Sequence, residues 1–176
     1  MYHKPAKLYN MSKIAILSDE LISQISAGEV IERPASAVKE LVENSVDAGA
    51  SHIVVEIEEG GLKKIRVSDD GVGISEADAR LAFERHATSK LAVLDDLFNI
   101  RSLGFRGEAL ASIASVSRVV MKTKTGDSRR GVELIIDGGK EVSFEECASE
   151  DGTDICVYGL FQHTPARKKY MKSERT

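Results

Sequence analysis

The sequence is most informative at residues Lys39–Gly49, which read Lys-Glu-Leu-Val-Glu-Asn-Ser-Val-Asp-Ala-Gly. Apolar residues recur in and before this stretch at the spacing of one helix face. Pro34, a few residues earlier, suits the first turn of a helix, and Gly49 suits the left-handed residue that ends one. The stretch therefore predicts a helix that begins at Pro34 and ends before Gly49.

Three polar side chains of this helix, Glu40, Asn44 and Asp47, are spaced at i, i+4 and i+7 and share one face. We expect that face to lie opposite the apolar residues Val38, Leu41 and Val42. An asparagine is a mediocre helix former, but its amide oxygen beside a carboxylate suits a Mg2+ ion that keeps several waters. The carboxylate one turn earlier could orient and deprotonate an attacking water. The alternative is an ordinary solvated helix face.

A β-hairpin is predicted next, because apolar and polar residues alternate in Ile53–Ile57 and in Ile65–Val67, with Gly60-Gly61 between them. Residues Ser68–Ile74 follow and read Ser-Asp-Asp-Gly-Val-Gly-Ile. Two glycines one residue apart let a flat ligand approach the backbone closely. A buried carboxylate beside them can accept a hydrogen bond from the amine of adenine. An ordinary Asp-Gly turn is the alternative.

Two further stretches suit phosphate binding: His86–Lys90, which reads His-Ala-Thr-Ser-Lys, and Gly104–Leu110, which reads Gly-Phe-Arg-Gly-Glu-Ala-Leu. Gly107 precedes a predicted helix, whose free N–H groups and dipole favour phosphate. Lys90 and Arg106 add positive charge, and the glycines suit the hinges of a lid that orders over a nucleotide. A surface loop with routine charges is the alternative.

The remaining patterns predict the fold class. Residues 14–30 are expected to be partly helical. Further helices are expected at Ser75–Arg85, which opens with a capping-box pattern, at Leu91–Phe98 and at Glu108–Ile113. Strands are expected at Arg118–Lys124, Val132–Ile136, Glu141–Glu145 and Thr153–Tyr158. Early helices and late strands indicate an α+β domain, with an open sheet that has helices on one face.

Composition and missing motifs exclude several function classes. The 176 residues carry a net charge of −4, which rules out a wholly basic nucleic-acid-binding coat. No apolar run approaches the roughly 20 residues of a membrane span, and Met1–Asn10 does not resemble a secretory signal. Two cysteines, Cys147 and Cys156, exclude a disulfide framework and a cysteine zinc site. The P-loop, Rossmann and H-E-x-x-H patterns are absent.

Taken together, the motifs resemble the Bergerat-fold (GHKL) ATPases, which have E-x-x-x-N on a helix, D-x-G-x-G after a strand, and then a glycine lid. The wording is most similar to the MutL family of mismatch-repair ATPases, at Ile25–Ala35, Lys39–Gly49, His86–Lys90 and Gly104–Ile113. The resemblance covers about residues 14 to 172. It implies a mixed, mostly antiparallel sheet in a GHKL ATP-binding domain at residues 14–176, after an N-terminal tail of residues 1–13.

The resemblance also implies a role for each matching residue. Glu40 would be the general base for water, and Asn44 would coordinate the Mg2+ that bridges the phosphates. Asp69 would hold the adenine amino group, with Gly73 against the ring, and Thr153 would reach the adenine end through its hydroxyl and a water. The remaining residues of the nucleotide site would be Thr88, Ser89 and Lys90, and the lid residues Gly104, Phe105, Arg106, Gly107, Glu108, Ala109 and Leu110.

The resemblance implies ATP and Mg2+ as ligands, with ATP-driven closure of the lid and self-dimerisation that reverses after hydrolysis. It implies coupling of mismatch recognition by a MutS-type protein to downstream strand processing, in the cytoplasm or nucleoid, or in the nucleus of a eukaryote, without a membrane. MutL proteins continue into a second, transducer domain and a C-terminal dimerisation region. This sequence stops at Thr176, so we expect it to lack both and to hydrolyse ATP slowly.

The sequence departs from the family at two points. The first is Asp69-Asp70-Gly71, where the family writes D-N-G, so Asp70 replaces an asparagine. An extra carboxylate would be unhelpful beside phosphates unless it points away. Phe161–Arg167 reads Phe-Gln-His-Thr-Pro-Ala-Arg where the family writes F-Y-N-T-P-A-R, which bears on packing at the strand end.

DNA is expected to bind weakly, without sequence preference and with strong sensitivity to salt. The candidate contacts are Lys122–Arg130 and Arg167–Arg175, and solvated surface charge is the alternative for both. The chain as a whole is expected to be an ATPase. One alternative is a nucleotide-gated binding module with negligible turnover. Another is a sensor-kinase catalytic domain, against which the wording of His86–Lys90 and Gly104–Ile113 speaks.

Overall fold

The computed structural model describes Ser18, Ile22, Ile25, Ala27, residues 30–85, Ala87 and residues 107–173. Its strands are β1 (Ile53–Glu58), β2 (Lys64–Asp69), β3 (Arg118–Lys124), β4 (Gly131–Asp137), β5 (Lys140–Cys147) and β6 (Gly152–Tyr158). Its helices are α2 (Pro34–Asp47), α3 (Glu76–Ala79), α4 (Ala109–Val116) and α5 (Pro165–Ser173), with two short 3-10 turns, η1 (Glu59–Gly61) and η2 (Leu81–Phe83).

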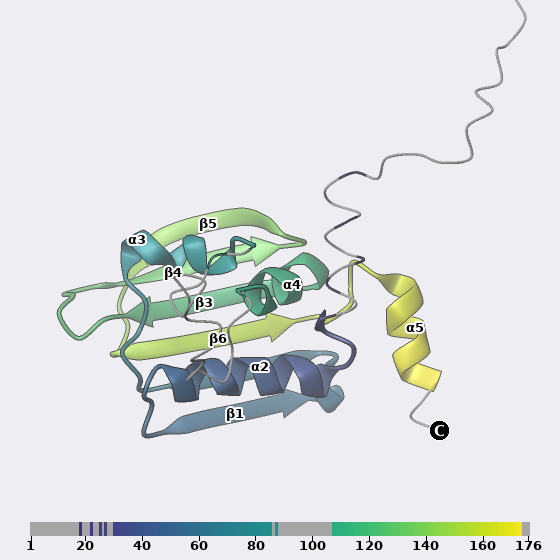
Figure 1. Cartoon of the computed structure of the whole chain (residues 1–176), viewed down its shortest axis with the longest axis horizontal. Coiled ribbons are helices and arrows are strands. Elements are labelled where there is room, and N and C mark those ends of the chain that lie inside the picture. Colours follow the sequence, from purple (N-terminus) through teal and green to yellow (C-terminus); the bar gives the residue numbers. More distant parts are fainter. Residues whose placement is uncertain are drawn as a thin grey trace, which may run out of the picture.

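The six strands form one sheet in the order β1-β2-β6-β3-β4-β5. Each of the five neighbouring pairs is antiparallel. Strand β6 comes last in the sequence but lies in the middle, between the β1–β2 hairpin and the β3-β4-β5 meander. Helices α2, α3 and α4 lie on one face of the sheet, and α5 lies at one end (Figure 1). The predicted α+β class, open sheet and single helical face are confirmed.

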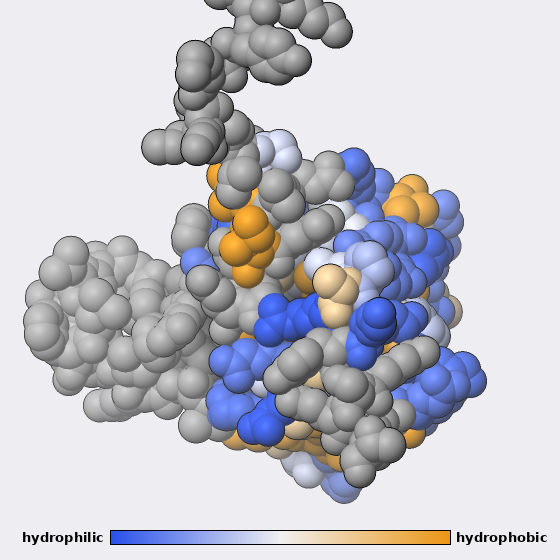
Figure 2. All heavy atoms as spheres, turned by 90° about the vertical axis from the view of Figure 1, so that its right-hand side faces the viewer, coloured by the Kyte–Doolittle hydropathy of each residue, from blue (hydrophilic) through white to orange (hydrophobic). Residues whose placement is uncertain are grey.

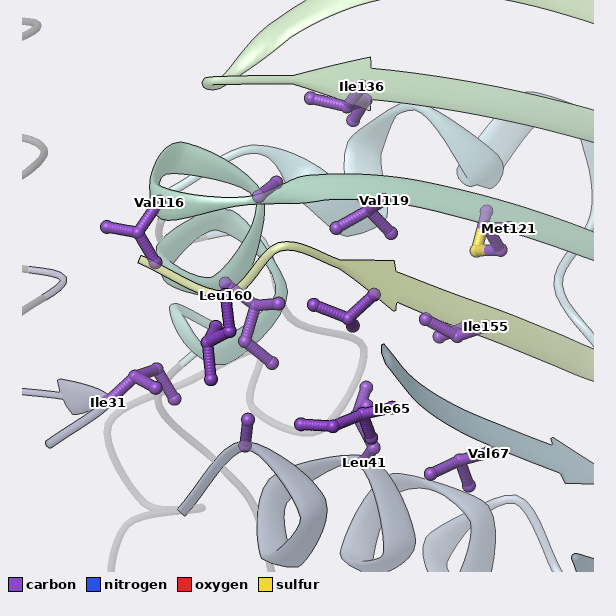
Figure 3. Close-up of a cluster of buried hydrophobic side chains, with 14 of the residues drawn as sticks. Ile31, Leu41, Ile65, Val67, Val116, Val119, Met121, Ile136, Ile155 and Leu160 are labelled. Atoms are coloured by element: carbon purple, nitrogen blue, oxygen red, sulfur yellow. The ribbon is translucent and has the colours of Figure 1, made fainter. Parts of the chain in front are cut away.

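The core fills the layer between the sheet and the helices. Alternate residues of a strand point to opposite faces, and one set is buried along β2, β3, β4 and β6, while the edge strands β1 and β5 have no fully buried residue. Val119 and Met121 of β3 and Ile65 of β2 lie in this layer with Leu41 of α2 (Figure 3), and all four are almost fully buried. This packing fixes α2 across the sheet, and with it the polar residues that α2 carries.

The predicted helix at Pro34 is confirmed, and so is its end. Gly49 has a φ of 72°, and its N–H donates to the carbonyl of Val46 at 2.9 Å. The predicted hairpin and all four predicted late strands are also present. Of the stretch 14–30, the described residues Ile22, Ile25, Ala27 and Val30 are helical. The helix expected at Leu91–Phe98 lies outside the described residues.

The helix expected at Ser75–Arg85 is shorter than predicted. The cap itself is confirmed, because the Ser75 Oγ accepts from the Asp78 N–H at 3.2 Å. The α-helix ends at Ala79, however, and the chain tightens into η2, where the Phe83 N–H donates to the Arg80 carbonyl at 3.1 Å. Arg80 is bound to β5: it makes two bonds to Glu141, at 2.8 and 3.0 Å. These tertiary contacts outweigh the local helix signal.

Helix α5 is absent from the sequence-based prediction, although Pro165 opens it as a proline at a first helical position does. The departure from the family pattern falls on Gln162 and His163, and the matching residue before them, Phe161, is fully buried. The next two side chains bind the β4–β5 turn: Gln162 Nε2 and His163 Nε2 lie 3.1 and 2.7 Å from Asp137 Oδ1. The chain leaving β6 is therefore fastened to the sheet before α5 begins.

The surface at the α5 end of the molecule is mainly hydrophilic, with separate apolar patches among the described residues (Figure 2). Within the part of the chain that the structure describes, no helix is long and apolar enough to cross a membrane.

Candidate functional site

Polar side chains gather where β2 and β3 end, β6 begins and α2 ends. Asp69 of β2 is paired with Thr153 of β6, and Thr153 is paired in turn with Thr123 of β3. Directly paired residues of antiparallel strands lie on the same face. The three side chains therefore form one row across the sheet, on the face that the helices cover. We refer to Asp69, Thr153 and Thr123 as the polar row.

The Asp69 carboxylate is fixed through both of its oxygens. Ser45 Oγ of α2 donates to Oδ2 at 2.7 Å, and the Gly71 N–H donates to Oδ1 at 3.0 Å. Ser45 is only 3% exposed, so its hydroxyl has little access to water. An ionised carboxylate offers about four acceptor positions, so two remain for a ligand. The arrangement presents a rigid acceptor to an amine donor.

Glycines next to the polar row allow the backbones to approach one another. Gly73 has a φ of 69°, and a Cβ there would lie 2.1 Å from the carbonyl oxygen of Lys124. Gly152 has a φ of 110°, and a Cβ there would lie 2.0 Å from the carbonyl oxygen of Asp69. Packing alone therefore requires glycine at both positions. The contact of Gly73 with an adenine ring stays a prediction.

Asp70 points away from the polar row. Its carboxylate accepts from the Ser51 N–H and hydroxyl, both at 2.7 Å, and from the His52 N–H at 2.8 Å. The bond from the His52 backbone, followed by the bond from the Ser51 hydroxyl, holds the pKa of Asp70 well below its usual range. Asp70, which stands where the family has asparagine, thus binds the two residues that precede β1, and its negative charge does not point toward the polar row.

Asp70→Asn should destabilise the protein at neutral pH and lose that effect in acid. A depressed folded-state pKa contributes stability above the unfolded value of about 4, and this stability is lost as the pH falls below it. The gap in urea midpoint between the original and variant proteins should therefore be widest near neutrality and shrink below about pH 4. Equal gaps at both pH values would contradict the assignment of these bonds.

The predicted polar face of α2 lies beside the buried stripe rather than opposite it. The stripe consists of Ala37, Leu41 and Ser45, and not of the expected Val38, Leu41 and Val42. Small side chains at two of the three positions let the helix approach the sheet closely, so the valines move to the flank. Glu40 and Asn44 are consequently half-buried, and the Glu40 side chain is 29% exposed.

The charge around Glu40 is modest. Lys39 Nζ lies 3.8 Å from Glu40 Oε1 but 2.8 Å from Glu43 Oε2, so it pairs mainly with Glu43. Asp47, the third residue of the predicted face, is also half-buried. The Glu40 carboxylate is thus partly shielded from water, and the neighbouring cation, Lys39, pairs mainly with Glu43.

The donor set on α2 fits a magnesium ion that arrives with phosphates. Among the described residues, no three His, Cys, Asp or Glu side chains cluster closely enough to hold a metal ion by themselves. Mg2+ commonly takes one or two protein oxygens and completes its shell with water and phosphate. Asn44 supplies an amide oxygen one turn from the carboxylate of Glu40, which suits that mode.

The described part of the predicted lid leads into α4. Gly107 has a φ of 60°, Glu108 is the N-cap residue, and α4 begins at Ala109, beside Leu110. The helix contacts α2, so its start belongs to the same layer as Glu40 and Asn44. The other predicted lid and nucleotide-site residues, Thr88, Ser89, Lys90, Gly104, Phe105 and Arg106, lie outside the described residues.

The first predicted DNA-binding stretch is largely neutralised. Lys122 pairs with Glu133 at 3.0 Å, Arg130 pairs with Glu146 at 2.6 Å, and Lys124 pairs with Asp151. These acids come from β4, β5 and the β5–β6 loop, which is why the sequence window alone suggests more positive charge than the surface has. Of the second stretch, Arg167 lies over the ring of Phe161, 5.5 Å from its centroid.

Two residues of the site are missed by the sequence-based reasoning: Ser45 and Thr123. Each has a recognisable signal in hindsight. Ser45 continues the buried spacing of Ala37 and Leu41, and Thr123 continues the alternation of Val119 and Met121. A polar residue in the register of a buried stripe must find a hydrogen-bond partner inside the protein.

The fold and the site together define a class of protein. Residues 31–150 match the family described as histidine kinase-, DNA gyrase B- and HSP90-like ATPases. The match covers more than half of the chain, which therefore belongs to this family. Its E-x-x-x-N helix and D-x-G-x-G loop are the segments that carry Glu40, Asn44, Asp69 and Gly73.

Within the family, the chain is similar to DNA mismatch repair protein MutL. It is 60% identical to MutL of Geobacillus sp. over 166 residues, which cover 94% of this chain and 27% of the relative. It is also similar to the crystal structure of the N-terminal domain of a DNA repair protein, with a TM-score of 0.71, 32% identity, and 88% of this chain and 44% of that chain covered. It is similar, too, to the Aquifex aeolicus MutL ATPase domain complexed with ADP, with a TM-score of 0.61 and 31% identity, and 80% of this chain and 48% of that chain are covered. The chain spans about a quarter of the length of the curated relatives it matches.

Proposed function

We propose that this chain binds MgATP and hydrolyses it slowly, as the ATPase domain of a MutL-type mismatch-repair protein. The observation that carries the proposal is the Asp69 carboxylate, held by Ser45 and Gly71 at 2.7 and 3.0 Å and aligned with Thr153. A fixed acceptor recognises the exocyclic amine of adenine. The similarity to MutL proteins over 94% of the chain supports the assignment to mismatch repair.

Helix α2 carries three side chains of the proposed site, Glu40, Asn44 and Ser45. Ser45, near its C-terminal end, orients the adenine acceptor Asp69. Glu40, near the middle of the helix and one turn before Asn44, is half-buried and is the proposed base that takes a proton from the attacking water. Since Glu40, Asn44 and Ser45 lie on one rigid helix, the residue that orients the proposed adenine acceptor and the proposed base stay at a constant distance from each other.

Asn44 is the proposed protein ligand of Mg2+, and the ion would supply charge neutralisation at the phosphates. The N-terminal end of α4, with Gly107 before it, is the proposed seat of the phosphate groups, because free N–H groups and the helix dipole attract anions there. Thr88, Ser89 and Lys90 complete the proposed nucleotide site, and Gly104–Leu110 the proposed lid.

The wider cycle is part of the proposal. ATP binding would close the lid and favour self-dimerisation, and the closed form would pass a mismatch signal from a MutS-type protein to strand processing on DNA in the cytoplasm or nucleoid. Contact with DNA would be weak and salt-sensitive. The ion pairs of Lys122, Lys124 and Arg130 favour the second candidate DNA contact, Arg167–Arg175, over the first.

Calorimetric titration with MgATP tests the proposal. The original chain should bind saturably, and Asp69→Asn should lose most of that binding. An asparagine has an NH2 group in place of one carboxylate oxygen, so a donor would face either Ser45 or Gly71, and the negative charge would be lost. Asp70→Asn is the matched control: the neighbouring carboxylate faces Ser51 and His52, so binding should persist. Absence of binding by the folded original chain would overturn the proposal.

A second function from a different class is a nucleotide-gated binding module, in which ATP orders the lid with negligible turnover. The observation that favours it is that Asp69 is held through both of its oxygens, at 2.7 and 3.0 Å, whereas the side chain of Glu40, the proposed base, is 29% exposed and lies 3.8 Å from Lys39 Nζ. Both functions require the same adenine site, so binding does not separate them, and turnover does.

A further inference from the structure

Thr123 is the most highly connected buried hydroxyl among the described residues, and the function proposed above leaves it without a role. It is 0% exposed. Its Oγ1 accepts from the Ile74 N–H at 2.8 Å and lies 3.0 Å from the Gly152 carbonyl oxygen and 3.0 Å from Thr153 Oγ1. Thr123 therefore joins the residue that follows the D-x-G-x-G loop, the first residue of β6 and the neighbouring member of the polar row.

Counting protons fixes the direction of these bonds. A threonine hydroxyl has one proton to donate and two lone pairs that accept. The carbonyl of Gly152 can only accept, so the Thr123 proton must go to it if that contact is a bond. The Ile74 N–H takes one lone pair of Thr123. The remaining lone pair can only accept the proton of Thr153, so all three contacts are satisfied in a single arrangement.

The consequence falls on Thr153. With its proton committed to Thr123, the Thr153 oxygen presents only lone pairs to a ligand. The next member of the polar row, Asp69, is an acceptor as well. In this scheme Thr153 contacts the base directly, in place of the water-mediated contact that the family resemblance implies. Two acceptors side by side then match an NH2 group, which has two protons to give, and repel a carbonyl oxygen at the same place.

We propose that Thr123 is a positioning residue that locks Thr153 as a hydrogen-bond acceptor and so makes the site select a 6-amino purine over a 6-oxo purine. The inference rests on the proposed function, because it concerns the same nucleotide site. Thr123 touches no ligand in this scheme. It acts through Thr153, and through Ile74, the residue that directly follows the D-x-G-x-G loop.

The test compares ATP with ITP, which carries an oxygen in place of the 6-amino group. Affinities of both Mg-nucleotides are measured by calorimetry on the whole chain. Thr123→Val keeps the shape and removes the hydroxyl, so Thr153 becomes free to rotate. The ratio of ATP to ITP affinity should fall about tenfold, the size of one net hydrogen bond. Thr123→Ser restores the hydroxyl and should keep the original ratio.

The ratio separates positioning from simple loss of structure, because both nucleotides bind the same folded population. Thr153→Val guards against a Thr123→Val protein that does not fold. It leaves the bonds of Thr123 to Ile74 and Gly152 in place, and it should lower the ratio to the same extent. An unchanged ratio in either valine variant, or a serine variant as impaired as Thr123→Val, overturns the inference. If the folded original chain binds neither nucleotide, the proposed function fails, and the inference fails with it.

Discussion

Glu40→Gln should lower the rate of ATP hydrolysis by about 10²- to 10⁴-fold, the usual contribution of a general base. ATP binding should change little, because glutamine has the same shape and the proposed adenine acceptor is Asp69, on strand β2. The Glu40 carboxylate is half-buried one turn before Asn44, and its side chain is 29% exposed. Phosphate release over hours at saturating MgATP measures the rate, and calorimetry measures binding.

Glu43→Gln is the control for this experiment. Glu43 lies on the same helix, is also half-buried and engages Lys39, but it has no proposed role in hydrolysis. Its removal should leave turnover within about twofold, since surface ion pairs contribute little. If turnover by Glu40→Gln equals that of the original chain, Glu40 is not the base, and the nucleotide-gated binding module becomes the better account.

Gly152→Ala should destabilise the domain by about 3–5 kcal/mol, from a strained φ and an overpacked backbone contact together. The new Cβ would lie 2.0 Å from the Asp69 carbonyl oxygen and 3.0 Å from the Asp70 Cα. Both are backbone atoms of the chain at the end of β2, so no side-chain rotation can relieve the overlap. Denaturant midpoints measure the loss, and ATP affinity should fall too, because Asp69 would be displaced.

Gly126→Ala provides the comparison. Gly126 lies in the exposed turn after β3, and a Cβ there would meet only Asp151 Oδ2, at 3.5 Å, an ordinary contact. Its effect should stay within about 0.5 kcal/mol. Similar losses for the two glycine variants would show that the close approach of β6 to the end of β2 does not limit stability.

Much of the fold is predictable from short-range patterns. The Pro34 and Gly49 signals locate both ends of α2, and alternation locates the strands, because each depends on residues close in the sequence. The failures have a different origin. The helix after Ser75 stops early because Arg80 is bound to Glu141, sixty-one residues away. Such long-range contacts leave no local pattern.

The candidate site divides in the same way. Residue patterns alone suggest Asn44 and the carboxylate of the Ser68–Ile74 stretch, whereas Thr153 enters only through the family resemblance, and the structure brings Asp69 and Thr153 into one row. The orientation of α2 is predicted wrongly, since hydrophobicity favours Val38 and Val42 over the smaller Ala37 and Ser45. Thr123 escapes notice because its importance lies in three contacts that only the packed sheet creates.

The central place of β6 has a consequence for how the chain acquires its structure during synthesis. The β1–β2 hairpin and the β3-β4-β5 meander are made first, yet nothing joins them in one sheet until residues 152–158 emerge, because β2 and β3 each pair with β6 and not with one another. Strand pairing across such sequence distances is slow, and unpaired edges are prone to aggregation while they wait. Asp69, the proposed adenine acceptor, meets Thr123 and Thr153 only at that final junction. On this proposal a nucleotide would bind only the completed sheet, and its binding would shift the folding equilibrium of the nascent domain toward that state.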